Sequence, residues 1–241
     1  MRLVGVGVGP GDPELVTVKG VRVLREAGLV VVPVMSADER GRAEATVRAH
    51  TDVEPLRLVF ALDDRGGPTV ERLSAWEAAA DQVAEQLRAG VDTVAFATIG
   101  DPNVYSTFTY LADAVRERLP EVQVETVPGI TAMQDLAARS GTVLCEGTES
   151  LALLPLTAGV DAFEQALTHF DTVVAYKGGR RMPQVLAVLE RLGRLEGAVY
   201  GAALGLPDEQ VGPAGALTGE TPYLSTVIVP ARGRTGRGSK L

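Results

Sequence analysis

The sequence has 241 residues, of which 46% are hydrophobic, enough for one large domain or two small ones with a sizeable core. Its formal net charge of −8 argues against nucleic acid as the main partner, because phosphate binding uses clustered Lys and Arg, but it does not exclude an acidic small molecule. The single Cys145 excludes an internal disulfide, and with two histidines it gives no metal-ligand spacing. No apolar run reaches the roughly 20 residues of a membrane span, and we expect no signal peptide before the first strand. We therefore expect a cytoplasmic protein without a bound metal or a membrane partner.

Strands and helices alternate along the first half of the sequence. Continuous apolar runs predict buried strands at 2–8, 29–34, 91–98 and 122–127. Apolar residues at helical spacing predict helices at 17–27, 36–49, 69–89 and 107–119. This order is typical of an α/β domain with a mostly parallel sheet.

The second half repeats the same style. Strands are predicted at 150–154, 172–176, 198–203 and 225–230, and helices at 130–140, 162–169 and 183–192. We expect two α/β domains with mostly parallel sheets, 1–122 and 123–231, and a flexible Gly/Arg tail at 232–241. The sequence ends in Ser239-Lys240-Leu241, which matches a peroxisomal address, although a tail that ends this way by chance is the more economical interpretation.

A glycine-rich loop follows the first predicted strand, with the sequence Gly5-Val6-Gly7-Val8-Gly9-Pro10-Gly11-Asp12. Glycine has no Cβ, so the backbone of this loop is able to approach a neighbour closely. The dinucleotide motif G-x-G-x-x-G fails on spacing, because Pro10 or Asp12 stands where its third glycine is needed. The phosphate loop G-x-x-x-x-G-K-[ST] is also absent. The loop therefore indicates a small-molecule site of another kind.

Two later passages are, like the first loop, glycine-containing segments that follow predicted strands. Ile99-Gly100-Asp101-Pro102-Asn103-Val104-Tyr105-Ser106 follows the predicted strand 91–98, and Val127-Pro128-Gly129-Ile130-Thr131-Ala132 follows the strand 122–127. The order and spacing of the three motifs resemble the tetrapyrrole methylases, which use S-adenosylmethionine, over roughly the whole chain. Within that family, the Gly-Asp-Pro-x-x-Tyr-Ser form and the stretch 146–155 are most similar to the branch that methylates C20 of precorrin-2 in cobalamin synthesis.

The resemblance implies an active-site cleft between the two domains, with the N-terminal one on the tetrapyrrole side and the C-terminal one sharing the donor site. It implies a homodimer, a small tetrapyrrole substrate, S-adenosylmethionine as methyl donor and no protein-bound metal. The donor-binding positions that it implies are Pro10, Gly100, Asp101, Val104, Thr131, Ala132, Lys177 and Gly205. Related sequences usually carry an apolar residue at the position of Lys177, so a backbone contact is the safer expectation there.

Several of these positions also have a purely local interpretation. The Asp101-Pro102 pair is typical of a turn, and Thr131 is typical of a helix N-cap. Gly205 fits a simple loop, and Asp12 fits an Asx turn onto its own backbone.

The resemblance also indicates residues that face the substrate: Asp12, Tyr105, Ser106 and Arg180. Asp12 and Tyr105 are the candidates for a catalytic role, although Tyr105 is equally compatible with packing. Precorrin-2 bears many carboxylates, which bidentate Arg contacts recognise well. The basic candidates for such contacts are Lys19, Arg139, Lys177, Arg180 and Arg181.

No Ser-His-Asp signature, metal set or paired-carboxylate motif stands out in the sequence. Methyl transfer from a sulfonium releases a neutral leaving group, so alignment of the reactants suffices and no acid–base pair is required. Three alternatives stay open. The first is the same reaction on the cobalt-loaded substrate. The second is another branch of the superfold, which methylates a different ring carbon, a modified histidine or RNA, and the third is a non-catalytic S-adenosylmethionine-binding module. A pure interaction domain does not need three glycine loops.

Overall fold

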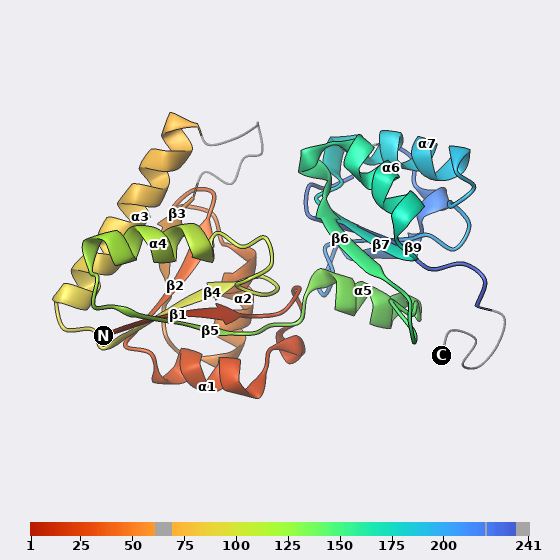
Figure 1. Cartoon of the computed structure of the whole chain (residues 1–241). Coiled ribbons are helices and arrows are strands. Elements are labelled where there is room, and N and C mark those ends of the chain that lie inside the picture. Colours follow the sequence, from red (N-terminus) through yellow and green to blue (C-terminus); the bar gives the residue numbers. More distant parts are fainter. Residues whose placement is uncertain (61–68, 220, 235–241) are drawn as a thin grey trace. The chain divides into compact units, whose positions relative to one another are not determined.

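The computed structural model of the chain describes residues 1–60, 69–219 and 221–234. The chain divides into two compact units, Met1–Thr131 and Ala132–Leu241 (Figure 1). Each unit is a sheet covered by helices on both faces, so the predicted α/β fold class is confirmed. No helix among the described residues is both long enough and apolar enough to cross a membrane.

The first unit is built on a five-stranded sheet in the order β3-β2-β4-β1-β5. All four strand pairs are parallel, as expected. Its strands are β1 (Arg2–Gly7), β2 (Leu29–Val34), β3 (Leu56–Val59), β4 (Thr93–Thr98) and β5 (Gln123–Val127). Strand β1 lies between β4 and β5 and pairs Leu3 with Val94 on one side and with Val124 on the other. Because all strands run in one direction, the loops after β1, β4 and β5 leave the same edge of the sheet side by side.

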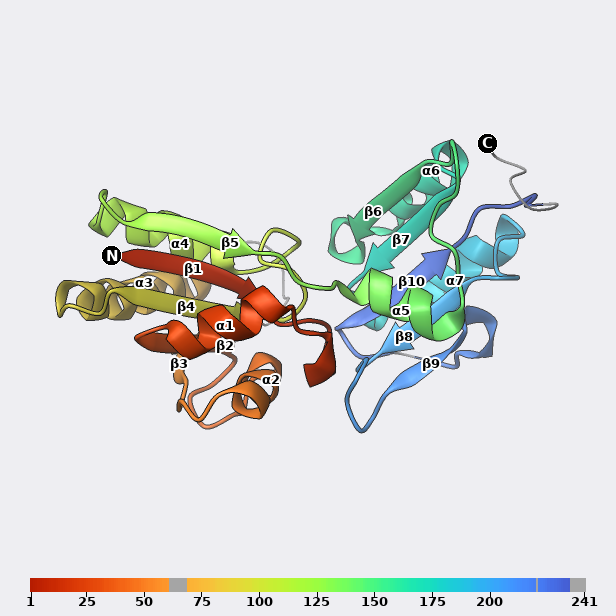
Figure 2. The same cartoon turned by 90° about the horizontal axis from the view of Figure 1, so that it is seen from below.

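Helices cover both faces of this sheet, as Figure 2 shows from below. The helices are α1 (Val18–Glu26), α2 (Arg42–His50), α3 (Val70–Arg88) and α4 (Phe108–Arg118), with the 3₁₀ turn η1 (Pro13–Leu15) before α1. Leu24 of α1 and Val47 of α2 pack on the face that presents Val4 and Val6. Val83 of α3 and Leu111 of α4 pack on the opposite face.

The second unit has a five-stranded sheet in the order β6-β7-β10-β8-β9. Its strands are β6 (Leu151–Pro155), β7 (Thr172–Tyr176), β8 (Val199–Ala202), β9 (Gln210–Pro213) and β10 (Ser225–Val229). Only β6 and β7 are parallel, and the other three pairs are antiparallel, so the expectation of a mostly parallel sheet is corrected for this unit. For β8 and β9 the reason is connectivity, because no helix lies between them and parallel neighbours need a long crossover.

Three longer helices cover the second sheet: α5 (Ala132–Ser140), α6 (Val160–His169) and α7 (Met182–Arg191). Leu136 of α5 packs on one face with Val174 and Ile228. Helices α6 and α7 cover the other face, where Phe163 and Leu189 belong to the larger core. The unit also contains the 3₁₀ turns η2 (Leu156–Ala158), η3 (Gly179–Arg181) and η4 (Ala214–Ala216).

The structure differs from the predicted element list in several places. The helix expected at 36–49 begins only at Arg42, because residues 36–40 are exposed and have no apolar stripe to bury. The short strands β3 and β9 are additions to the list. The compact units divide after Thr131, whereas the expected domain boundary lies after 122, because β5 completes the first sheet by pairing with β1.

The beginning of the expected tail is held by side-chain contacts. Arg234 pairs with Glu149, and Arg232 donates a hydrogen bond to the carbonyl of Leu192 at 3.2 Å. The rest of the tail, with the terminal Ser239-Lys240-Leu241, lies outside the described residues.

Candidate functional site

The three motif loops of the first unit meet at the carboxyl edge of its parallel sheet. The loop after β1 and the loop after β4 are joined by an isolated β-bridge between Gly9 and Gly100, in which Gly100 N–H donates to the Gly9 carbonyl at 2.8 Å. Both glycines have positive φ, 79° and 70°, which L-residues rarely adopt. Ligands of open α/β sheets bind at this edge, so the loops form a candidate site.

Glycines in these loops allow protein backbone to pack against protein backbone. A Cβ at Gly7 would lie 2.5 Å from the Gly100 carbonyl oxygen and 2.6 Å from the Gly129 nitrogen. A Cβ at Gly129 would lie 2.7 Å from Gly7 Cα. Gly100 differs, because the nearest atom to a Cβ there is Thr131 Cα at 4.0 Å. Two of the three glycines are therefore explained by loop contacts alone, whereas a Cβ at Gly100 would be less crowded.

The carboxylate of Asp101 clamps two of the loops together. Its Oδ1 accepts a hydrogen bond from Asn103 N–H at 2.8 Å, and its Oδ2 accepts one from Gly129 N–H at 3.0 Å. The first bond is the Asx turn expected for an Asp-Pro sequence. The second ties the loop after β4 to the loop after β5, which the sequence alone did not indicate.

The segment after Asp101 makes a tight turn into α4. Val104 N–H donates to the Asp101 carbonyl at 3.1 Å, and Val104 is half-buried. Tyr105 is 44% exposed and has a φ of 51°, in the left-handed region that a bulky side chain adopts only under constraint. Partial burial raises the pKa of the Tyr105 hydroxyl, so it stays protonated at neutral pH. The Ser106 hydroxyl is engaged locally, 2.9 Å from Thr98 Oγ1 and accepting from Phe108 N–H at 3.1 Å.

The first loop ends in a second local turn. Pro10 is buried, and Asp12 Oδ1 accepts from Glu14 N–H at 2.9 Å as the N-cap of η1. This hydrogen bond supports the local interpretation of Asp12 as a turn residue. A substrate-facing role of Asp12 stays a prediction.

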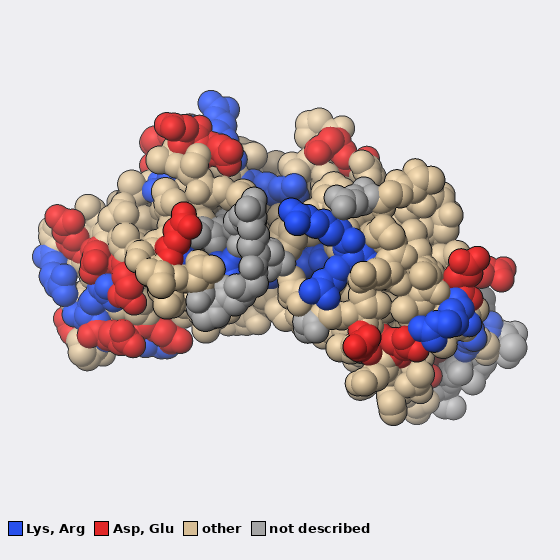
Figure 3. Space-filling view, turned by 90° about the horizontal axis from the view of Figure 1, so that it is seen from above, with Lys and Arg blue, Asp and Glu red and all other residues tan. Residues whose placement is uncertain are grey.

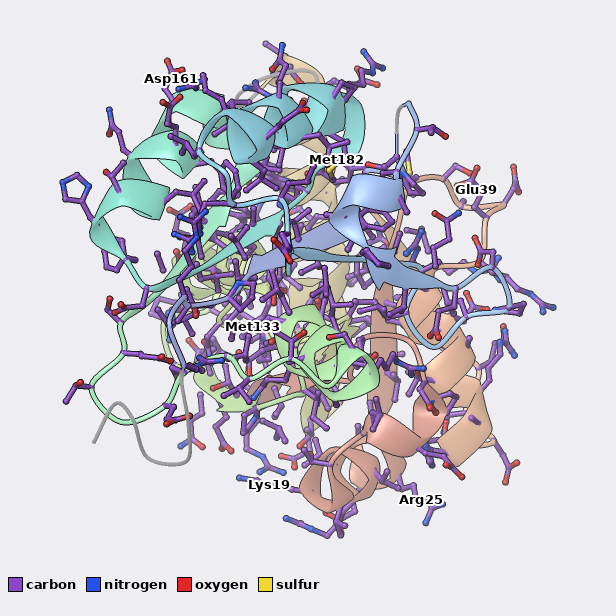
Figure 4. The ribbon with its side chains drawn as sticks, turned by 90° about the vertical axis from the view of Figure 1, so that its right-hand side faces the viewer. Lys19, Arg25, Glu39, Met133, Asp161 and Met182 are labelled. Carbon is purple, nitrogen blue, oxygen red and sulfur yellow. The ribbon has the colours of Figure 1, made fainter. Side chains whose placement is uncertain are left out.

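The candidate residues of the second unit gather at one edge of its sheet. Strands β7 and β8 both run antiparallel to β10, so their carboxyl ends lie at the same edge. Lys177 follows β7 with a φ of 62°, and its N–H donates to the Ser225 carbonyl at 2.9 Å. Its Nζ lies 5.8 Å from the centre of the Tyr223 ring, within cation–π range. The next residue, Gly178, has no room for a side chain, because a Cβ would overlap Met182 (labelled in Figure 4) and lie 2.7 Å from Ser225 Oγ.

The start of α5 is tied to this edge of the second sheet. Met133 N–H donates to the Tyr176 hydroxyl at 2.9 Å, and Met133 is labelled on α5 in Figure 4. Thr131, which immediately precedes α5 in the chain, is 8% exposed, and Ala132 is half-buried. Gly205 follows β8 with a φ of 72°, and its N–H donates to Glu209 Oε2 at 2.6 Å.

The basic candidates have different surroundings. Arg139 is committed to two acids: its Nε donates to Asp135 at 2.9 Å and its Nη1 lies 2.9 Å from Glu209, which argues against substrate binding. Lys19 is exposed on α1, where Figure 4 labels it. Arg180 is exposed in η3, and Arg181 there reaches the Thr157 carbonyl at 3.4 Å. Figure 3 shows acidic and basic side chains in separate small groups on the face that it draws.

Backbone strain is the feature of the site that motif reading missed. Tyr105, Lys177 and Ala203 are the non-glycine residues with positive φ in the described chain, and all three lie in loops at the carboxyl ends of strands or just beyond them. Strained residues of this kind cluster at functional sites. The sequence does not predict a positive φ at these three positions, because each is an ordinary residue whose conformation is imposed by its surroundings. Within the ranges that the structure describes, no group of three or more His, Cys, Asp or Glu side chains is placed to hold a metal ion.

Comparison with known proteins gives a consistent set of relatives. Residues 2–217 match the model of the tetrapyrrole (corrin/porphyrin) methylases. The chain is 34% identical over 243 residues to a precorrin-2 C(20)-methyltransferase of a Sinorhizobium species, covering 95% of each protein. It is 30% identical over 213 residues to the cobalt-precorrin-2 C(20)-methyltransferase of Salmonella typhimurium, covering 87% of this chain and 86% of that one. Among solved structures, the uroporphyrin-III C-methyltransferase of Thermus thermophilus has a TM-score of 0.65 at 25% identity, covering 95% of this chain and 92% of that one.

Proposed function

Because the chain belongs to the tetrapyrrole (corrin/porphyrin) methylase family, we propose that it transfers a methyl group from S-adenosylmethionine to C20 of precorrin-2, giving precorrin-3A in cobalamin biosynthesis. The observation that carries the proposal is the relation to the Sinorhizobium enzyme, which extends over nearly the whole of both proteins. A likeness confined to a donor-binding part would not distinguish a methyltransferase from a binding module.

We propose donor-contacting residues within each unit, as the family resemblance implies. Gly100, Asp101 and Val104 hold the methionine and sugar parts, with Pro10 beside them. Thr131 and Ala132 contact the donor from the start of α5. Lys177, through its backbone, and Gly205 contact the adenine. The surroundings of Gly100 support this assignment, because a Cβ there would meet only backbone, at Thr131 Cα, and no side chain.

The sulfonium of the bound donor supplies an electrophilic methyl group and a neutral leaving group. The chain's own residues then need only to hold the substrate in line with that methyl and to exclude water. Tyr105 is suited to donate a hydrogen bond to the substrate rather than to act as a base, because its raised pKa keeps the hydroxyl protonated. We assign Asp12, Ser106 and Arg180 to substrate contacts, with Arg180 facing a carboxylate arm.

The cobalt-loaded form of the substrate is the second candidate. The Salmonella relative, named for the cobalt-bearing precursor, favours it. In that case the metal travels in the macrocycle and needs no ligands from the protein. We further propose that the enzyme is a cytoplasmic homodimer without a nucleic-acid or membrane partner, as the sequence leads us to expect.

The test is turnover with S-adenosylmethionine and freshly prepared precorrin-2, with and without inserted cobalt, followed by product mass and the position of the new methyl. One added methyl at C20 on one form supports the proposal and selects the pathway. The variant Glu164→Ala, which alters a surface ion pair of α6 and α7, serves as a control that keeps full activity. Donor binding without methylation of either form would contradict the proposal and favour another ring position or the binding-module alternative.

A further inference from the structure

One ion-pair network of the second unit joins the start of the unit to a turn far along the chain. Arg139 on α5 donates from Nε to Asp135 Oδ1 at 2.9 Å and lies 2.9 Å from Glu209 Oε2 through Nη1. The same Glu209 carboxylate accepts the N–H of Gly205 at 2.6 Å. We call these residues, Asp135, Arg139, Gly205 and Glu209, the Arg139 network.

The network closes the loop between β8 and β9. Leu206 N–H donates to the Ala203 carbonyl and Glu209 N–H donates to the Leu206 carbonyl, both at 3.0 Å, so the loop consists of two successive turns. Ala203 has a φ of 50°, a strained conformation that its own side chain does not favour. Glu209 joins the second turn to Gly205 through its hydrogen bond with the Gly205 N–H, and it joins the turn to α5 through its ion pair with Arg139.

The charges of the network are partly withdrawn from water. The side chain of Asp135 is 5% exposed, and those of Arg139 and Glu209 are 27% and 30% exposed. The second oxygen of Asp135 is buried and has no hydrogen-bond partner among the described residues, so Arg139 is its main compensation. Removing Arg139 would leave a buried unpaired charge and damage the fold. Removing Glu209 leaves the Asp135–Arg139 pair in place and releases only the turn.

We propose that Glu209 is a positioning residue for the methyl donor, acting through Arg139 and the Gly205 N–H to hold the turn after β8 against α5. The inference rests on the proposed function, in which Gly205 and the start of α5 contact the donor. Gly205 lies at one end of this connection, and Arg139 lies near the C-terminal end of α5, so the helix itself links the network to the residues at its start. Glu209 itself does not touch the donor, because its carboxylate is already used by Arg139 and Gly205. Its effect is to keep two donor-contacting segments at a fixed separation.

The test compares variants at this position by calorimetry with S-adenosylhomocysteine and by turnover at saturating donor. Glu209→Ala is expected to weaken binding by about tenfold, equivalent to about 1.4 kcal/mol, with kcat changed by less than about twofold. Glu209→Gln keeps an oxygen that accepts from Gly205 N–H and is expected to recover part of the loss. Glu164→Ala is the matched control, since it removes a carboxylate that pairs with Arg191 at 2.7 Å on the surface of the same unit.

Two results would overturn the inference in distinguishable ways. If the wild type methylates its substrate but Glu209→Ala lowers only the melting temperature and leaves the dissociation constant unchanged, Glu209 has a structural role alone. If the wild type does not bind S-adenosylhomocysteine, the proposed function fails and the role of Glu209 fails with it. Should Glu209→Ala not fold, Glu209→Gln decides the question by the same two measurements.

Discussion

Asp101→Ala is the substitution whose effect the structure predicts most directly. It removes both hydrogen bonds of the carboxylate, to Asn103 N–H at 2.8 Å and to Gly129 N–H at 3.0 Å. A hydrogen bond to a charged group contributes about 1.5–3 kcal/mol. Asn103 is exposed, so water replaces its bond at little cost, whereas Gly129 is half-buried. We therefore expect the free energy of unfolding of the first unit to fall by about 2 kcal/mol, less than the sum of two such bonds.

The assay is urea unfolding followed by the fluorescence of Trp76. This is the single tryptophan of the sequence, and it stacks on Tyr110 between α3 and α4, so its signal reports on the first unit. With an m-value of about 2 kcal/mol/M, the midpoint is expected to shift by about 1 M. The control Asp113→Ala removes an exposed carboxylate that pairs with Arg116 on α4 and is expected to shift it by less than about a quarter of that.

The same variant separates the two roles of Asp101. We expect its affinity for S-adenosylhomocysteine to fall by about tenfold, because the clamped loops carry the proposed donor contacts. An unchanged unfolding midpoint would refute the clamp that we infer from the two hydrogen bonds. A lowered midpoint with unchanged affinity would keep the clamp and refute the donor role.

Hydrogen bonds from Arg57 and Arg48 lower the pKa of the buried Glu44 carboxyl to about 2. The ionised carboxylate therefore stabilises the folded state fully above about pH 4.5, and this stabilisation is lost as the pH falls toward 2. It amounts to at most about 3 kcal/mol after allowance for screening. Urea midpoints at pH 7 and pH 3 should differ more for the wild type than for Glu44→Gln, and equal differences would count against the ion pair. Gly129→Ala is expected to lower the melting temperature by several degrees because backbone atoms occupy the Cβ position, whereas Gly212→Ala, with open space at that position, should leave it unchanged. Equal melting temperatures for the two would contradict the loop packing. Because burial raises the pKa of Tyr105, the pH–rate profile between pH 6 and 9 should be the same for Tyr105→Phe and the wild type, and a limb that disappears in the variant would show that the tyrosine titrates there.

The structure also changes the meaning of an obvious mutation in the first loop. A valine at Gly9 would place a side chain in the first loop, where the donor is expected to approach. However, Gly9 has a φ of 79°, and a Cβ there would lie 3.0 Å from the Leu15 carbonyl oxygen. Such a variant strains the loop even without a ligand. Loss of activity in Gly9→Val therefore does not locate the donor.

Local sequence determined the regular elements of this protein. Buried runs such as 29–34 and 172–176 coincide with β2 and β7, because short, valine-rich apolar segments are typical of interior strands. The same reasoning located the three motif loops at the ends of strands. It failed for β9, whose residues are mostly exposed and lack an apolar pattern.

Tertiary structure alone decided the sheet direction of the second unit and the partners of the site residues. The antiparallel course of β10 between β7 and β8 depends on pairing between strands far apart in the chain. The bond from Asp101 to Gly129 spans 28 positions, and the bond from Arg139 to Glu209 spans 70. Propensity and periodicity act over a few residues, so they specify the helices and strands, while long-range packing specifies what the candidate site residues touch.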